Sequence, residues 1–193
     1  MNLFSKWFFF DPFDKQSILT FFLLNRNTGV IFFNNSGKDI RKFKHKIKSY
    51  VNSCKQRRIP FLIQNSIELA IKYNALGTFT YLNFLDKSLK FRLSFLKRPK
   101  TIQMFTVAHN LKEILISERN FFDSIFISPV YKTLSYENKV ALKPLKFIGL
   151  CHKSRLKNHA LGGISKKKFT RIKNKKLFGF GAITYFNEYF RLK

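Results

Sequence analysis

Apolar residues recur along this chain in two patterns that alternate with each other. Short apolar runs of three to eight residues are typical of buried strands, and they occupy residues 6–10, 29–33, 60–64, 76–80, 101–108, 124–128, 159–161 and 179–184. Between them, apolar positions return at steps of three and four. The clearest case is Ile40, Phe43, Ile47, Val51 and Cys54, with lysines filling the other face, which predicts an amphipathic helix.

The order of these segments predicts an α/β fold. Further helices are expected at residues 14–24, 65–73, 110–119, 143–152 and 166–174. Strands that alternate with helices are parallel and joined by right-handed crossovers. About eight such units predict a compact (β/α)8 TIM barrel. We find no internal repeat or linker, so the expectation is a single domain over residues 1–193.

One unit fits this scheme less well. Residues 83–100, NFLDKSLKFRLSFLKRPK, are basic and aromatic, and their apolar spacing suits no single helix. One interpretation is a distorted fourth barrel helix that is solvated on one side. The other is a patch that contacts RNA or a membrane surface. We favour the helix, because charge runs are usually solvated faces.

The charge of the chain is extreme. It has 37 Lys+Arg against 10 Asp+Glu, a formal net charge of +27, and 25 Phe. Such a charge attracts nucleic acid or anionic lipid, but it does not identify a partner. An AT-rich genome would enrich Lys, Asn, Ile and Phe together. We therefore expect no specific nucleic-acid partner.

The same composition bears on location. Cys54 and Cys151 lie far apart with no CxxC spacing, which suits a reducing compartment and argues against a disulfide framework or a zinc site. No run of about twenty uninterrupted apolar residues occurs, and the opening apolar burst is cut by Asp11 and Pro12. A cytoplasmic location without a membrane partner is the expectation, and the oligomeric state stays open.

Candidate chemistry is expected where the strands end. In parallel barrels the functional residues lie at the C-terminal ends of the strands, and the loops after strands seven and eight often bind phosphate. Here the seventh strand ends in Gly162 and Gly163, which permit close backbone approach and positive φ. Residues 166–168 place three lysines in the first turn of a helix, where cations oppose the helix dipole unless an anion lies nearby.

Several of these motifs resemble a known family. The chain reads FISPVYKTLSYENK, KPLKF, HALGGI and GFGAITYF in that order. This series is similar to the C-terminal half of the thiamine-phosphate synthase / TenI family, which carries a "GPVFPT" strand end, an "AIGGI" phosphate loop and a "GVAVVSA" last strand. The resemblance covers about residues 101–186. PFLIQNSIELAIKYNALGTFTYL, residues 60–82, extends it.

The resemblance implies a TIM barrel that joins a pyrimidine pyrophosphate to a thiazole phosphate and releases pyrophosphate. Carried over by position, the residues that would bind the thiazole phosphate are Gly162, Gly163, Ile183, Thr184, Thr133 and Ser135. Lys139 lies near the position of a pyrophosphate-binding lysine, and His109, after the fifth strand, is a candidate acid/base. The partners implied are small phosphorylated substrates.

The chain departs from the family at the other end of the expected site. Asn34 and Ser36 stand where the family has an Arg and a Lys, and Gln64 with Asn65 replace its "IND" motif at the expected pyrophosphate site. The second acidic ligand falls at about Phe84, with Asp86 nearest. Mg²⁺ is a possible cofactor, but its usual carboxylate ligands are replaced, so no metal ligand is assigned.

Three hypotheses follow. The first is a thiamine-phosphate synthase, and the second is a catalytically degenerate member that binds a thiazole phosphate or another small phosphate. The third is a basic RNA-associated protein. The thiazole tautomerase activity of the TenI branch uses a histidine where this chain has Ser128, which argues against that activity here.

Overall fold

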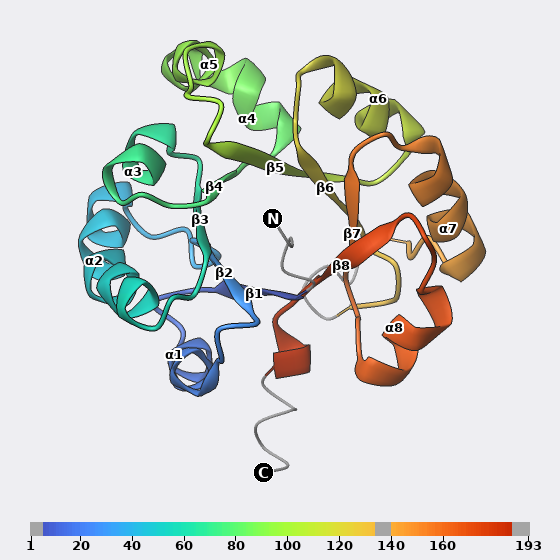
Figure 1. The fold of residues 1–193 in the computed structure, drawn as a ribbon, viewed down its shortest axis with the longest axis horizontal. Coiled ribbons are helices and arrows are strands. Elements are labelled where there is room, and N and C mark those ends of the chain that lie inside the picture. The colour runs from blue at the N-terminus through green and yellow to red at the C-terminus, as the bar shows by residue number, and fades with distance from the viewer. Residues whose placement is uncertain (1–5, 134–139, 187–193) are drawn as a thin grey trace.

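The strands form a closed barrel in which every neighbouring pair is parallel and the strand order follows the chain from β1 to β8 (Figure 1). The structure is a computed structural model and describes residues 6–133 and 140–186. This arrangement confirms the predicted TIM barrel. The strands are β1 (Lys6–Phe10), β2 (Gly29–Phe32), β3 (Phe61–Gln64), β4 (Gly77–Phe79), β5 (Gln103–Ala108), β6 (Ser124–Ile127), β7 (Lys157–Leu161) and β8 (Leu177–Ala182).

Helices surround the barrel and cover its outer face. They are α1 (Lys15–Leu23), α2 (Ile40–Gln56), α3 (Ile67–Lys72), α4 (Leu82–Lys87), α5 (Leu89–Leu96), α6 (Leu111–Arg119), α7 (Pro144–Lys153) and α8 (Lys166–Ile172). Several begin at a side chain that accepts a hydrogen bond from a first-turn N–H, and these caps are Asp14, Asp39, Ser66, Asn110 and Ser165. Among the described helices, none is long and apolar enough to cross a membrane.

The unit at residues 83–100 forms two short helices, α4 and α5, where one distorted helix was expected. Ser88 ends α4 and caps α5, because its hydroxyl accepts a hydrogen bond from the N–H of Phe91. Phe91 and Phe95 are buried with Met104 and Phe122. The segment therefore packs against the barrel as the helical part of its fourth βα unit. Its apolar spacing is irregular because one helix ends and another begins at Ser88.

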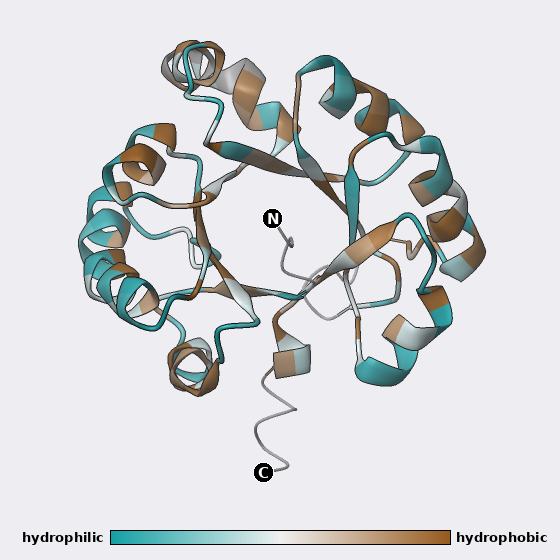
Figure 2. Cartoon of the chain, in the orientation of Figure 1, coloured by the Kyte–Doolittle hydropathy of each residue, from teal (hydrophilic) through white to brown (hydrophobic). Residues whose placement is uncertain are grey.

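Aromatic side chains fill the barrel interior. The ring of Phe9 makes edge contacts with Phe33, Phe79 and Phe126 at centroid distances of 5.6, 5.3 and 5.4 Å. Gly29 and Gly181 leave the space that the rings need, since a Cβ at Gly29 would lie 2.4 Å from the Trp7 ring. A larger cluster packs between the barrel and its helices. Figure 2 shows the resulting alternation of hydrophobic and hydrophilic positions along the helices.

One histidine lies inside this aromatic interior. The His159 ring is fully buried, 5.2 Å from the Phe126 ring and 6.0 Å from the Phe105 ring. Neither ring nitrogen has a hydrogen-bond partner among the described residues. Burial, and secondarily the charge of Lys157, lower the pKa of His159 from its ordinary 6.5 to about 3. The ring is therefore neutral and acts as a core residue.

Candidate functional site

A cavity of about 230 Å³ opens at the C-terminal end of the barrel. Its wall combines aromatic rings from the N-terminal strands with polar and basic groups from the loops after β6, β7 and β8. The lining residues are Phe9, Phe33, Asn35, Tyr81, Ser128, Lys132, Thr133, Leu161, Gly162, Gly163, Ile164, Ser165, Lys168, Ala182, Ile183, Thr184 and Tyr185. The lining thus combines aromatic rings with polar and cationic groups.

Five of the six residues expected to bind phosphate line this one cavity. Thr133 follows β6, Gly162 and Gly163 follow β7, and Ile183 with Thr184 follow β8. The sixth, Ser135, lies outside the described residues, as does Lys139. The fold therefore brings three separate sequence motifs to one place.

The glycine pair is required by the backbone around it. Gly162 has φ +93° and Gly163 has φ +63°, conformations that L side chains rarely adopt. A Cβ at Gly163 would lie 2.5 Å from the carbonyl oxygen of Lys132, and one at Gly162 would lie 2.8 Å from the Pro129 Cβ. The N–H of Tyr131 donates to the Gly162 carbonyl at 3.2 Å. These glycines therefore let the loop after β6 pack directly on the loop after β7.

Only one of the three lysines at the start of α8 lines the cavity. Lys168 is partly buried there, whereas Lys166 and Lys167 are exposed. The Tyr131 hydroxyl donates to the Lys168 carbonyl at 3.0 Å, and the Lys168 Nζ lies 5.2 Å from the centroid of the Tyr131 ring. Burial raises the pKa of Tyr131, opposed by the charge of Arg171. Tyr131 thus joins the loop after β6 to α8 and holds the Lys168 side chain at its ring.

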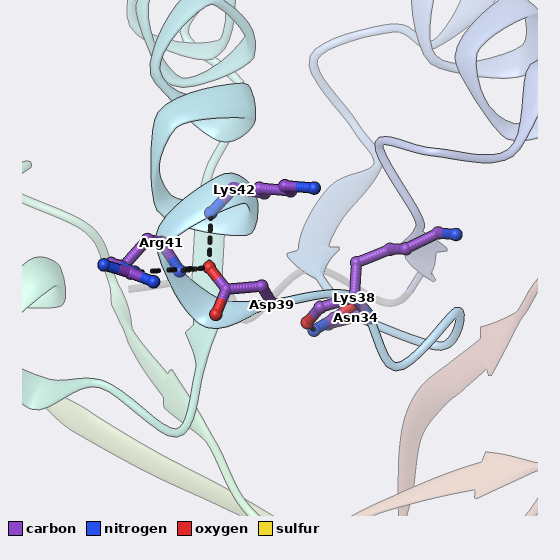
Figure 3. Close-up of polar contacts among 5 residues, drawn as sticks. All are labelled: Asn34, Lys38, Asp39, Arg41 and Lys42. Carbon is purple, nitrogen blue, oxygen red and sulfur yellow. Dashed lines mark hydrogen bonds and ion pairs between the residues drawn. The ribbon is translucent and has the colours of Figure 1, made fainter.

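The loop after β2 is held by its own polar groups. Asn34 exchanges two hydrogen bonds with the Lys38 backbone, of 2.7 and 3.1 Å, and the next residue, Asp39, caps α2 through the N–H groups of Arg41 and Lys42 (Figure 3). The N–H of Asn34 also donates to the Gln64 side-chain carbonyl at 2.8 Å. Asn34 and Gln64 are therefore engaged within the protein, and neither lines the cavity.

A buried carboxylate fixes the same loop from the other side. Asp11, just after β1, accepts hydrogen bonds from the Ser36 N–H at 2.9 Å and the Ser36 hydroxyl at 2.7 Å. It also accepts the N–H of Phe13 at 2.9 Å. Ser36, which the resemblance aligns with a basic residue of the family, is thus a structural partner of Asp11. The loop that carries Asn35 to the cavity is held in place by these bonds.

Gln64 and Asn65, at the expected metal position, do not suit Mg²⁺. The Asn65 side-chain oxygen accepts the Thr80 hydroxyl at 2.7 Å, and the Gln64 oxygen accepts the Asn34 N–H. Both are neutral amides, and Mg²⁺ favours carboxylates with near-octahedral geometry. Phe84 and Asp86 lie in α4, and the structure does not describe the Asp86 side chain. Within the described residues, no group of three His, Cys, Asp or Glu could hold a metal ion.

His109 lies at the end of β5 but outside the cavity lining. Its Nδ1 is 2.6 Å from the Ser128 carbonyl oxygen, so that nitrogen carries the proton and donates it. Its backbone N–H donates to Glu113 at 2.8 Å. His109 thus orients the end of β6, where Ser128 does line the cavity. The acid/base role stays a hypothesis.

Sequence reasoning missed Phe9 and Phe33 in the cavity lining, because each belongs to an apolar run that resembles ordinary core. Tyr81 and Lys132 lie at strand ends where function was expected, but neither was assigned a role. Phe9 and Phe33 had no such signal, since the inward face of each strand is visible only once the barrel register is known.

The chain is similar in fold to solved TIM-barrel structures. Thiamine phosphate pyrophosphorylase from Pyrococcus furiosus matches with a TM-score of 0.72 and 13% identity, over 95% of this chain and 87% of that chain. Tryptophan synthase from M. tuberculosis matches with a TM-score of 0.64 and 9% identity, over 97% of this chain and 85% of that one. No curated protein sequence matches.

The sequence itself defines the family. The model of the TMP-TENI family, thiamine monophosphate synthase, matches residues 22–185. This match spans every lining residue of the cavity except Phe9. The chain belongs to the thiamine monophosphate synthase family, as its motifs predicted.

Proposed function

We propose that the cavity binds a small organic phosphate ester, with a thiazole phosphate as the ligand that the family suggests. The observation that carries this proposal is that Thr133, Thr184 and Lys168 line one cavity together with Gly162 and Gly163. Two hydroxyls, a lysine and exposed backbone suit the oxygens of a phosphate group.

The aromatic residues of the lining support the class of ligand. Phe9, Phe33 and Tyr81 line the cavity with flat apolar rings, which suit the body of a small heterocycle by stacking and burial. A phosphate held by Thr133, Thr184 and Lys168 would leave the heterocycle to contact these rings. The ligand would then be oriented by its charged end.

Binding without turnover is favoured over the coupling reaction. The pyrophosphate end expected from the family is occupied by internal hydrogen bonds of Gln64, Asn34 and Asn65 and does not suit Mg²⁺. The coupling of a pyrimidine pyrophosphate to the thiazole phosphate is the second candidate. It is supported by Lys132, a cation in the cavity wall that could receive the charge of a leaving pyrophosphate.

Calorimetric titration with the thiazole phosphate and with its unphosphorylated alcohol tests the proposal. The phosphate ester should bind at least roughly tenfold more tightly, because charge-assisted hydrogen bonds form only with the phosphate. Lys168→Ala should remove most of this preference. Lys167→Ala changes an exposed neighbour outside the cavity and should keep it. Equal affinities for ester and alcohol in the wild-type protein would overturn the proposal.

A further inference from the structure

An apolar ridge lies on the outside of α1, away from the cavity. Leu19, Phe22 and Leu23 are 61%, 58% and 54% exposed, and their spacing of three and four residues places them on one side of the helix. Figure 2 shows α1 as a mainly hydrophobic helix on the barrel surface. Three large, neighbouring apolar side chains in water indicate a surface that meets a partner.

Cations flank this ridge on the neighbouring helix. The rings of Phe22 and Tyr50 are 6.3 Å apart, so Tyr50 marks the side of α2 that faces α1 (Figure 1). Lys46 and Lys42 precede Tyr50 by four and eight residues, which places them on that same side, and both are exposed. Within and after α1, Lys15 and Arg26 are exposed as well.

Little negative charge offsets these cations. Asp39 is the only acidic residue between Asp14 and Glu68. Its carboxylate caps α2 and lies 3.6 Å from the Nε of Arg41, and Asp14 caps α1. The ridge is therefore apolar at its centre and positive around it.

We propose that the face formed by α1 and the adjoining side of α2 docks on an anionic lipid surface. Apolar side chains enter the interface of a bilayer while surrounding cations contact its headgroups. A second copy of this chain would bring the same cations against each other, and RNA would leave Leu19 and Leu23 without an apolar partner. This inference does not depend on the phosphate cavity. The expectation of no membrane partner rested on the lack of a spanning segment, which does not bear on peripheral contact.

Sedimentation with vesicles tests the proposal, using phosphatidylcholine alone and phosphatidylcholine mixed with phosphatidylserine. The protein should bind only the mixed vesicles, and Leu19→Ser/Phe22→Ser should weaken binding by roughly tenfold or more through lost apolar burial. Lys42→Glu/Lys46→Glu should weaken it more than the matched pair Lys44→Glu/Lys48→Glu, which changes the same charge on the side of α2 away from α1. Circular dichroism would confirm that each variant is folded.

A Phe22→Trp variant tests whether lipid or RNA contacts the apolar ridge of α1. The native Trp7 is fully buried in the barrel, so the wild-type emission can be subtracted as a constant background. The fluorescence emission of the introduced tryptophan should shift to the blue when mixed vesicles are added and stay unchanged when the RNA poly(U) is added.

Four results would overturn the proposal. The first is no binding to mixed vesicles, and the second is binding of vesicles and poly(U) alike with equal effects of both lysine pairs. The third is a blue-shifted emission of the introduced tryptophan in the free monomer, before any vesicle is added. The fourth is a dimer in sedimentation that the Leu19→Ser/Phe22→Ser variant abolishes.

Discussion

The side-chain carbonyl of Gln64, at the end of β3, accepts a hydrogen bond from the backbone N–H of Asn34 at 2.8 Å. This contact joins two neighbouring strand ends at the place where the family resemblance implies pyrophosphate binding. An amide that satisfies a backbone donor in this way has a structural role. The contact holds the start of the loop after β2, where the resemblance implies cations that would grip pyrophosphate.

Gln64→Ala tests that structural role. The variant removes the partner of a part-buried N–H, so the free energy of unfolding should fall by about 1–2 kcal/mol in urea titration. The affinity for the thiazole phosphate should change less than about threefold, since Gln64 does not line the cavity. Unchanged stability with a large loss of pyrophosphate affinity would contradict this account.

Gly163→Ala should destabilise the protein by about 1–3 kcal/mol, because its φ of +63° is strained for alanine and its Cβ would meet the Lys132 carbonyl at 2.5 Å. The matched control is Gly149→Ala in α7, where nothing beyond the adjacent residues and the helix's own backbone lies within 4 Å of the added Cβ. That change should stabilise the helix by about 0.5–1 kcal/mol. Urea unfolding of both variants measures the difference, and equal effects would refute the packing argument.

The buried His159 predicts a loss of stability in acid. Its pKa is about 3 in the folded protein and 6.5 in the unfolded chain, so the unfolded chain takes up the proton first. The stability that neutral His159 contributes is therefore complete above pH 6.5 and is lost progressively as the pH falls toward 3. Between pH 6.5 and 5 this amounts to about 2 kcal/mol.

Urea unfolding at several pH values measures this slope, with His159→Phe as the comparison. The variant should lack that share of the pH dependence, because phenylalanine suits the surrounding rings and does not titrate. A variant with the full wild-type slope between pH 6.5 and 5 would show that other groups cause it.

The fold was predictable because two sequence patterns agree. Short apolar runs indicate the strands, and apolar residues at steps of three and four indicate the helices between them. Asp14, Ser66 and Asn110 cap helices by accepting a hydrogen bond from a first-turn N–H, so these helix starts depend only on residues that are close in sequence. The division at Ser88 was missed, because a serine between two short apolar segments is as compatible with one irregular helix as with two.

The site was predictable in part, for a related reason. Gly162 and Gly163 carry a local signal, since positive φ is a property of the residue itself. The hydrogen bonds that Asn34 donates to Gln64 and Ser36 donates to Asp11 join residues 30 and 25 positions apart. Such pairs exist only after the barrel closes, so residues that looked like remnants of a pyrophosphate site were not distinguishable from loop supports.

Binding without turnover is tested most directly by pyrophosphate release from the purified protein, given the pyrimidine pyrophosphate, the thiazole phosphate and Mg²⁺, alongside calorimetric binding of the thiazole phosphate alone. The thiazole phosphate should bind, Mg²⁺ should leave its affinity unchanged, and no pyrophosphate should be released above background. Mg²⁺-dependent release that Lys132→Ala abolishes would contradict binding without turnover and make the protein a synthase.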